Sequence, residues 1–189
     1  MRRRLPASPT TPNPNSYWVV KDRFLAGEYP GGNTAGEARH KIKAFLEAGI
    51  TSFIDLTPAD EMFPYASLFK GAGIDYRRFP ILDNGVPTNP PQMIEILDAV
   101  DAAMAAERKV YVHCQAGVGR TGMVVACWLQ RHGRSPREAL RELRELWRTT
   151  DRSQRMRRSP NRAVQVAWVK GWAKQEGGRP GTAEERKVT

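Results

Sequence analysis

Apolar side chains recur along this chain at the two spacings that distinguish strands from helices. Short runs rich in β-branched and aromatic residues predict strands at 17–20, 23–26, 50–56, 75–79 and 110–113. Apolar positions three or four residues apart predict helices at 34–48, 90–104, 120–132 and 135–147. Two further helices are less regular. One at 60–70 is interrupted by Pro64, and one opens at Ser159 and Pro160 with an apolar face of Val164, Ala167, Trp168 and Trp172.

The order of these elements predicts the fold class. Strands that alternate with helices form a mostly parallel sheet with helices on both faces, so we expect an α/β fold with about four to five strands. Capping boxes at Thr34 with Glu37 and at Ser135 with Glu138 place two helix starts. We expect one domain at 16–175, with flexible tails at 1–15 and 176–189.

Composition indicates the class of protein and its cellular location. The 189-residue chain is 40% hydrophobic and 26% charged, as is usual for soluble globular proteins. It contains no run of 18 apolar residues, which predicts no membrane span. A basic start followed by prolines lacks the apolar stretch of a secretory signal. The two cysteines, Cys114 and Cys127, fit a reducing, cytoplasmic location, with Cys127 expected in the core.

The net charge of +10 is concentrated in one stretch. Between Arg131 and Arg162 eleven arginines face four acidic residues, so this stretch alone carries +7. The cluster Arg152, Arg155, Arg157 and Arg158 is open to two interpretations, a solvated surface or a surface that attracts anionic partners. Nucleic acid is a less favoured partner, because aromatic side chains do not alternate with the basic ones and no zinc-ligand spacing occurs.

The segment 113–122, His-Cys-Gln-Ala-Gly-Val-Gly-Arg-Thr-Gly, carries the candidate chemistry. It lies between a predicted strand and a predicted helix, where backbone N–H groups and the helix N-terminus together favour an anion. Gly117 and Gly119 allow a close backbone approach. Arg120 can bind two oxygens of a phosphate, and the same positive field favours the thiolate of Cys114.

Two other interpretations of this segment are weaker. Gly117–Gly122 also matches the G-x-G-x-x-G pattern of dinucleotide-binding folds. That fold expects an acidic residue at the end of the next strand, whereas Glu138 lies in a predicted helix. A buried structural Cys114 beside a surface Arg120 would leave the glycine pair and His113 unexplained.

With its histidine, glycines and threonine, this Cys-x5-Arg segment resembles the phosphate loop of the cysteine-dependent protein tyrosine and dual-specificity phosphatases. The resemblance extends over about residues 16–172 and implies a phosphotyrosine-phosphatase-like fold. It implies that Cys114 attacks phosphorus, while Arg120 and the backbone of Gln115, Ala116, Gly117, Val118 and Gly119 bind the phosphate oxygens. The Thr121 hydroxyl would assist the departing sulfur. The implied chemistry uses no metal and no cofactor.

This chemistry also needs an acid to protonate the leaving oxygen. The resemblance places an aspartate on a loop some 30 residues before the cysteine, and Asp83 lies 31 residues before Cys114. An alternative is that Asp83 caps a turn with Asn84. Asp60 is a weaker candidate for the acid, Asp75 starts a strand, and Asp55 is expected to be structural.

Two supporting residues are expected behind the nucleophile. His113 would hold carbonyl groups of the loop and help to tune the thiol. Gln165 could position the hydrolytic water, although a surface glutamine on a helix is the simpler interpretation.

The substrate is left open between three hypotheses. The first is an active phosphatase for proteins, specific for phosphotyrosine or of dual specificity, and the expected partner is a phosphorylated protein or a small phosphate ester. The second is the same chemistry on an inositol phosphate or an RNA 5′ end, as the basic surface suggests. The third is a module that binds phosphate without turnover. Gln115, Ala116 and Val118 are neutral, whereas phosphoinositide phosphatases of this family often carry lysines there, so that substrate class is less favoured.

Overall fold

The structure is a computed structural model that describes residues 11–176. One five-stranded sheet has the order β1-β2-β5-β3-β4. Its strands are β1 (Ser16–Val20), β2 (Phe24–Gly27), β3 (Ile50–Asp55), β4 (Asp75–Arg78) and β5 (Lys109–His113). Only β1 runs antiparallel to its neighbour, and the other three pairings are parallel. The predicted α/β class with a mostly parallel sheet is confirmed.

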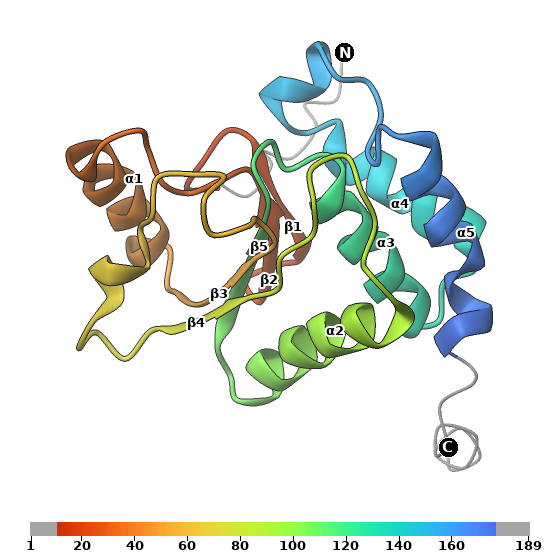
Figure 1. Ribbon diagram of the computed structural model, residues 1–189, viewed down its shortest axis with the longest axis horizontal. Coiled ribbons are helices and arrows are strands. Elements are labelled where there is room, and N and C mark those ends of the chain that lie inside the picture. The colour runs from red at the N-terminus through yellow and green to blue at the C-terminus, as the bar shows by residue number, and fades with distance from the viewer. Residues whose placement is uncertain (1–10, 177–189) are drawn as a thin grey trace, which may run out of the picture.

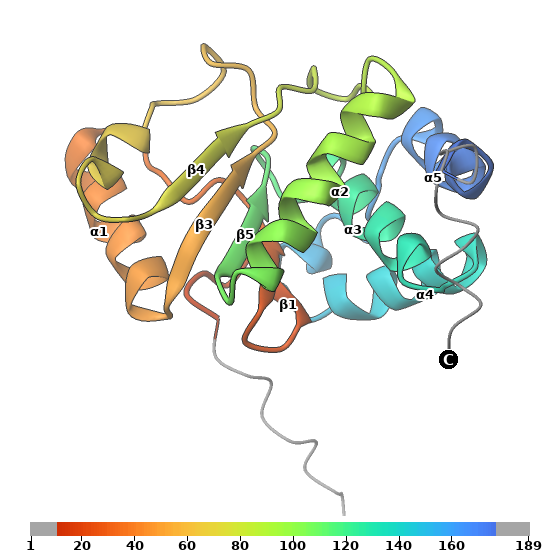
Figure 2. The same ribbon diagram turned by 90° about the horizontal axis from the view of Figure 1, so that it is seen from below.

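Helices cover both faces of this sheet (Figures 1 and 2). Helix α1 (Ala35–Glu47) lies on one face, where its Phe45 packs against Phe53 and Tyr111 of the sheet. Helices α2 (Pro90–Ala105) and α3 (Arg120–Arg131) cover the other face. Helices α4 (Pro136–Trp147) and α5 (Ala163–Glu176) pack on α3, which is therefore buried from Arg120 to Leu129.

The predicted helix starts are confirmed by their side-chain caps. The Thr34 hydroxyl accepts a hydrogen bond from Glu37 N at 3.2 Å. Ser135 and Glu138 form a reciprocal capping box at the start of α4. These caps satisfy backbone donors that have no partner within the helix.

Two predicted helices differ from the structure. The segment 60–70 contains only the short 3-10 helix η1 (Ala66–Phe69), because Pro64 lacks an N–H and the Phe63 carbonyl accepts a hydrogen bond from the Tyr29 hydroxyl. A second 3-10 helix, η2 (Asp151–Gln154), was not predicted.

The last helix begins at Ala163 rather than at Ser159. The Ser159–Pro160 peptide is cis, and the Ser159 hydroxyl donates to the Val118 carbonyl at 2.7 Å instead of capping a helix. The predicted apolar face is also wrong in part. Helix α5 buries Gln165, Val169 and Trp172, whereas Val164 is exposed.

Residues 11–15, which the sequence assigned to the N-terminal tail, contact the folded body. Asn13 Nδ2 donates to Glu28 Oε1 at 2.9 Å, and Arg152 N donates to Asn15 Oδ1 at 2.8 Å. Glu176, where the predicted C-terminal tail starts, is the last residue of α5 (Ala163–Glu176). The remaining parts of the predicted tails, 1–10 and 177–189, lie outside the described residues. None of the helices in residues 11–176 combines the length and the apolar composition that a membrane-spanning helix requires.

Candidate active site

The candidate site residues follow the carboxyl ends of neighbouring strands. Cys114 comes directly after β5, Glu61 follows β3, and Asp83 follows β4. Parallel strands end at the same edge of a sheet, so the topology brings these segments together there. This edge is where open α/β folds commonly bind ligands.

The loop 114–119 forms a hollow of about 190 Å³ at the N-terminus of α3. We refer to it as the Cys114 hollow. The free N–H groups and the dipole of the helix favour an anion at this point. Its lining contains every predicted loop residue except Gly117, and consists of Asp83, Asn84, Cys114, Gln115, Ala116, Val118, Gly119, Arg120, Met156, Asn161, Arg162 and Gln165.

Gly117 is required by two independent features of the loop. Its φ of +72° lies in the left-handed region, which disfavours other residues. A β-carbon there would come within 2.5 Å of the Gly27 carbonyl carbon and 2.6 Å of Glu28 N. The loop therefore packs its backbone directly on the end of β2, and Tyr29 N donates to the Gln115 carbonyl at 3.0 Å.

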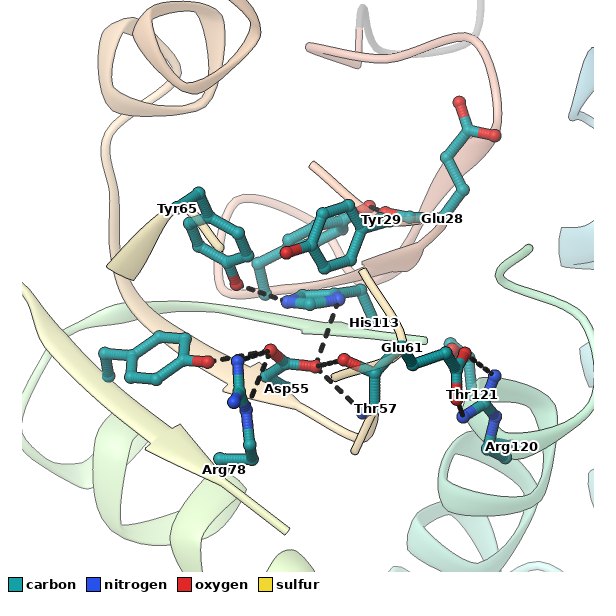
Figure 3. Close-up of polar contacts among 12 residues, drawn as sticks. Glu28, Tyr29, Asp55, Thr57, Glu61, Tyr65, Arg78, His113, Arg120 and Thr121 are labelled. Carbon is teal, nitrogen blue, oxygen red and sulfur yellow. Dashed lines mark hydrogen bonds and ion pairs between the residues drawn. The ribbon is translucent and has the colours of Figure 1, made fainter. Parts of the chain in front are cut away.

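Arg120 is almost completely buried, with 2% of its side chain exposed, and several hydrogen-bond acceptors surround its guanidinium group. Glu61 binds the end of the guanidinium with both oxygens, at 2.7 Å from Nη1 and 2.6 Å from Nη2 (Figure 3). The Ile81 carbonyl accepts from Nη1 at 3.0 Å, and Asp83 Oδ1 accepts from Nη2 at 3.1 Å. Four of the five N–H donors are thus engaged, and only Nε–H lacks a partner within the described residues.

Burial alone would lower the pKa of Arg120, but its hydrogen bonds to Glu61 and the charges of Cys114 and Asp83 raise it. Glu61 was missed by the sequence analysis, which predicted a helix at 60–70 and named only Asp60 there as a candidate. The signal that could have found it is an acidic residue in the loop after β3, at the same sheet edge as Cys114.

Asp83 lies at the rim of the Cys114 hollow on a loop that is tied to the α5 region. Its carboxylate accepts from Asn84 Nδ2 at 2.7 Å, so the predicted turn contact is present as well. Arg162 Nε donates to Asn84 Oδ1 at 2.7 Å, and Gln165 Nε2 donates to the Gly85 carbonyl at 3.0 Å. These two contacts hold the loop 83–85 beside the hollow. Arg162 was not anticipated from the sequence.

Comparison with known proteins identifies the family. A family model described as "Polymorphic toxin system, DSP-PTPase phosphatase" matches residues 28–134, which include Asp83 and the whole Cys114 loop. This is more than half of the chain. The chain belongs to the DSP-PTPase phosphatase family.

Curated relatives agree with this assignment over part of their length. Protein 067L of Invertebrate iridescent virus 3, named as a tyrosine phosphatase, is 31% identical over 115 residues, covering 59% of this chain and 44% of its own. Dual specificity protein phosphatase CDC14C of Homo sapiens is 30% identical over 126 residues, covering 62% of this chain and 26% of its own. The match therefore spans less than half the length of these relatives.

Solved structures show the same fold. Tk-PTP in its active form matches with a TM-score of 0.68 at 23% identity, covering 85% of this chain and 97% of its own. TpbA of P. aeruginosa in complex with pTyr matches with a TM-score of 0.64 at 18% identity, covering 92% of this chain and 94% of its own. The phosphotyrosine-phosphatase-like fold is therefore confirmed.

In this member of the family, Gln165 is buried beside the phosphate loop. Only 1% of the residue is exposed, so the interpretation as a surface glutamine is wrong. A β-carbon at Gly119 would meet both terminal atoms of the Gln165 amide at 2.7 Å, which shows how closely the two residues pack. The amide oxygen Oε1 has no hydrogen-bond partner in residues 11–176. A buried acceptor at the wall of a hollow is suited to bind a water molecule.

His113 lies behind the nucleophile in an aromatic and acidic surrounding. Its Nε2 is hydrogen-bonded to the Tyr65 hydroxyl, and its Nδ1 lies 3.9 Å from Asp55 Oδ1, too far for a hydrogen bond (Figure 3). Burial lowers the pKa of His113 to about 4 despite the nearby Asp55. The imidazole is therefore neutral at pH 7. Its ring contacts Tyr65 and Asp55, and the Cys114 backbone also acts on its pKa, so the expected role of His113 in holding the loop stays a prediction.

Asp55 is completely buried and fixes the strand ends below the site. It accepts from Thr57 N at 2.8 Å, from the Tyr76 hydroxyl at 2.7 Å and from Arg78 Nη2 at 3.1 Å. Burial raises the pKa of this carboxyl, but His113 and the hydrogen bonds from Thr57 and Tyr76 outweigh burial, and the pKa is lowered. These contacts agree with a structural role.

Two further residues named from the sequence, Thr121 and Cys127, are both buried. The Thr121 hydroxyl is buried and donates to the Gly27 carbonyl at 3.3 Å. Cys127 is completely buried, and burial raises the pKa of its thiol well above the ordinary value. Residues 11–176 contain no cluster of histidine, cysteine and carboxylate side chains able to hold a metal ion.

Proposed function

We propose that this protein hydrolyses phosphate monoesters through a phosphocysteine intermediate, and that its substrates are proteins phosphorylated on tyrosine or on both tyrosine and serine or threonine. One observation carries the proposal. Cys114, Arg120 and Asp83 line the same hollow at the N-terminus of α3. A nucleophile, a phosphate-binding group and an acid are the three groups that this reaction requires.

In the first step the sulfur of Cys114, as the thiolate, attacks phosphorus and the bond from phosphorus to the ester oxygen breaks. Asp83 donates its proton to that oxygen, which leaves as an alcohol. In the second step a water molecule attacks phosphorus, Asp83 takes one of its protons, and the phosphorus–sulfur bond breaks to release phosphate and the thiolate. The Thr121 hydroxyl turns from the Gly27 carbonyl to support the departing sulfur, and the Oε1 atom of Gln165 accepts a hydrogen bond from the water.

The hydrogen bonds of Arg120 indicate how a substrate phosphate would replace Asp83 on the guanidinium. Glu61 and the Ile81 carbonyl hold the guanidinium from behind. A phosphate that approaches along the edge formed by Nε and Nη2 takes the free Nε–H and replaces Asp83 on Nη2. Substrate binding thus releases the Asp83 carboxyl from its ion pair, so that it can turn to the leaving oxygen.

Several features support a protein substrate over other phosphate esters. The relatives include phosphatases named for tyrosine and for dual specificity, and TpbA was solved with pTyr. The loop side chains at Gln115, Ala116 and Val118 are uncharged, whereas a phosphoinositide with several phosphates would favour cations there. A cytoplasmic location belongs to the same proposal, because Cys114 must stay a free thiol.

Turnover of p-nitrophenyl phosphate tests the proposal. Wild type is expected to release nitrophenol in a vanadate-sensitive reaction, and Cys114→Ser is expected to abolish it. Cys127→Ala is the matched control, since it removes the other thiol and should keep the activity. A wild type without vanadate-sensitive turnover would leave only a phosphate-binding module. A panel of phosphotyrosine and phosphoserine peptides, inositol phosphates and 5′-triphosphorylated RNA then tests the substrate class.

A further inference from the structure

A second hollow, of about 350 Å³, lies between α4 and the segment 157–160. We call it the arginine hollow. It shares no lining residue with the Cys114 hollow. Four arginines and no carboxylate surround it, and the complete lining is Leu140, Arg144, Arg148, Arg157, Arg158, Ser159, Pro160 and Val166. Of the cluster Arg152, Arg155, Arg157 and Arg158 noted in the sequence, only Arg157 and Arg158 line this hollow.

The charges of the arginine hollow are not balanced within the described residues. Some other arginines of the same stretch have carboxylate partners, as Arg134 has Glu142 at 2.8 Å and Arg131 has Asp98 at 2.8 Å. No guanidinium group of these four arginines has a hydrogen-bond or ion-pair partner in residues 11–176. Arg144 in the last turn of α4 and Arg148, the C-cap residue of that helix, stand four residues apart, a spacing at which like charges repel. An anion bound between them would relieve this repulsion.

The shape and chemistry of the hollow indicate the class of anion. One guanidinium group can bind two oxygens of a phosphate at the same time. Because one phosphate carries at most about two negative charges, the four positive charges of the hollow match at least two phosphates. The lining has no aromatic side chain on which a nucleic-acid base could stack. We propose that the arginine hollow binds a small molecule that carries two or more phosphate groups. This site does not depend on the proposed catalytic function.

The hollow lies on the other side of a segment that also lines the candidate active site. Arg157 and Arg158 face the arginine hollow, whereas Met156 and Asn161 line the Cys114 hollow. Variants of Arg144 and Arg148 are therefore the cleaner test, because these two residues lie outside the segment 156–161 that contributes to both hollows.

The experiment measures binding of inositol hexakisphosphate by calorimetry, with vanadate present to occupy the Cys114 hollow. We expect saturable binding to one site. Arg144→Gln with Arg148→Gln should weaken it at least about tenfold, because charged hydrogen bonds are lost. The matched control is Arg137→Gln with Arg141→Gln, which removes the same charge at the same spacing from exposed positions of α4 outside the hollow. The control pair should change the affinity by less than about threefold, since only long-range attraction is lost.

Circular dichroism and p-nitrophenyl phosphate turnover show whether each variant is folded. Equal weakening in the two double variants would overturn the proposal, because it would show general attraction to a basic surface. Non-saturable binding, or inorganic phosphate binding as tightly as the hexakisphosphate, would also overturn it. The same applies if single-stranded RNA binds more tightly than the hexakisphosphate and depends equally on Arg144 and Arg148.

Discussion

Replacing Asp83 should have opposite effects on catalysis and on phosphate binding. The residue is the proposed acid, but its carboxylate also accepts a hydrogen bond from Nη2 of Arg120, which the substrate phosphate needs as a donor. Its Oδ1 lies 3.1 Å from Nη2 of Arg120, and its side chain is 54% exposed. Replacement by asparagine keeps the size of the side chain but removes the negative charge. An incoming phosphate would then neither compete with a carboxylate for Nη2 nor be repelled by it.

The magnitude follows from the exposure of the pair. Ion pairs with an exposed partner contribute about 0.2–1 kcal/mol, and the burial of Arg120 places this pair in the upper half of that range. An energy of about 0.5–1 kcal/mol corresponds to about a two- to fivefold change in affinity. Asp83→Asn should therefore bind inorganic phosphate about two- to fivefold more tightly, while kcat falls by about 10²–10⁴ because the acid is lost.

The assay is competitive inhibition of p-nitrophenyl phosphate turnover by inorganic phosphate. Asp60→Asn is the matched control, since it removes an exposed negative charge in the neighbouring loop that has no contact with Arg120. The control should leave kcat and the inhibition constant within about twofold. Weaker phosphate binding by Asp83→Asn, or a shift equal to that of Asp60→Asn, would refute the competition between Asp83 and substrate.

Three further outcomes are expected. Gly122→Ala should lower the free energy of unfolding by about 1–3 kcal/mol, because its β-carbon would lie 2.2 Å from the Ser159 hydroxyl oxygen. Gly171→Ala in α5 should raise the free energy of unfolding by about 0.5–1 kcal/mol, because its β-carbon meets nothing closer than 3.7 Å. Urea unfolding of both variants measures this pair, and equal effects would contradict the packing argument. Gln165→Ala should slow the second step, so that rapid-mixing assays show a burst of nitrophenol followed by slow turnover, and a uniformly slow reaction without a burst would remove Gln165 from that step. The pKa of His113 is about 4 in the folded protein and 6.5 ordinarily. Its contribution to the free energy of unfolding should therefore be complete above pH 6.5. Up to about 3 kcal/mol of it should be lost as the pH falls towards 4, because the unfolded chain binds the extra proton. His113→Gln should flatten this part of the pH profile of unfolding, and an unchanged slope would place the titration elsewhere.

The sequence by itself determined the order of the elements and the segment that carries the chemistry. Strand and helix periods report which side chains face a core, and caps such as Ser135 with Glu138 act within four residues of the chain. The phosphate loop is equally local, because Cys114 and Arg120 belong to one turn between β5 and α3. Features of this kind can be read from neighbouring residues.

Only the tertiary structure decided which distant residues join that loop. Glu61 lies 59 positions before Arg120 and reaches its guanidinium because β3 and β5 are adjacent in the sheet. Gln165 becomes buried because the start of α5 at Ala163 sets which face of the helix turns to the loop. Contacts of this kind depend on strand order and helix rotation, which arise from the packing of the whole chain and leave no periodic signal in the sequence.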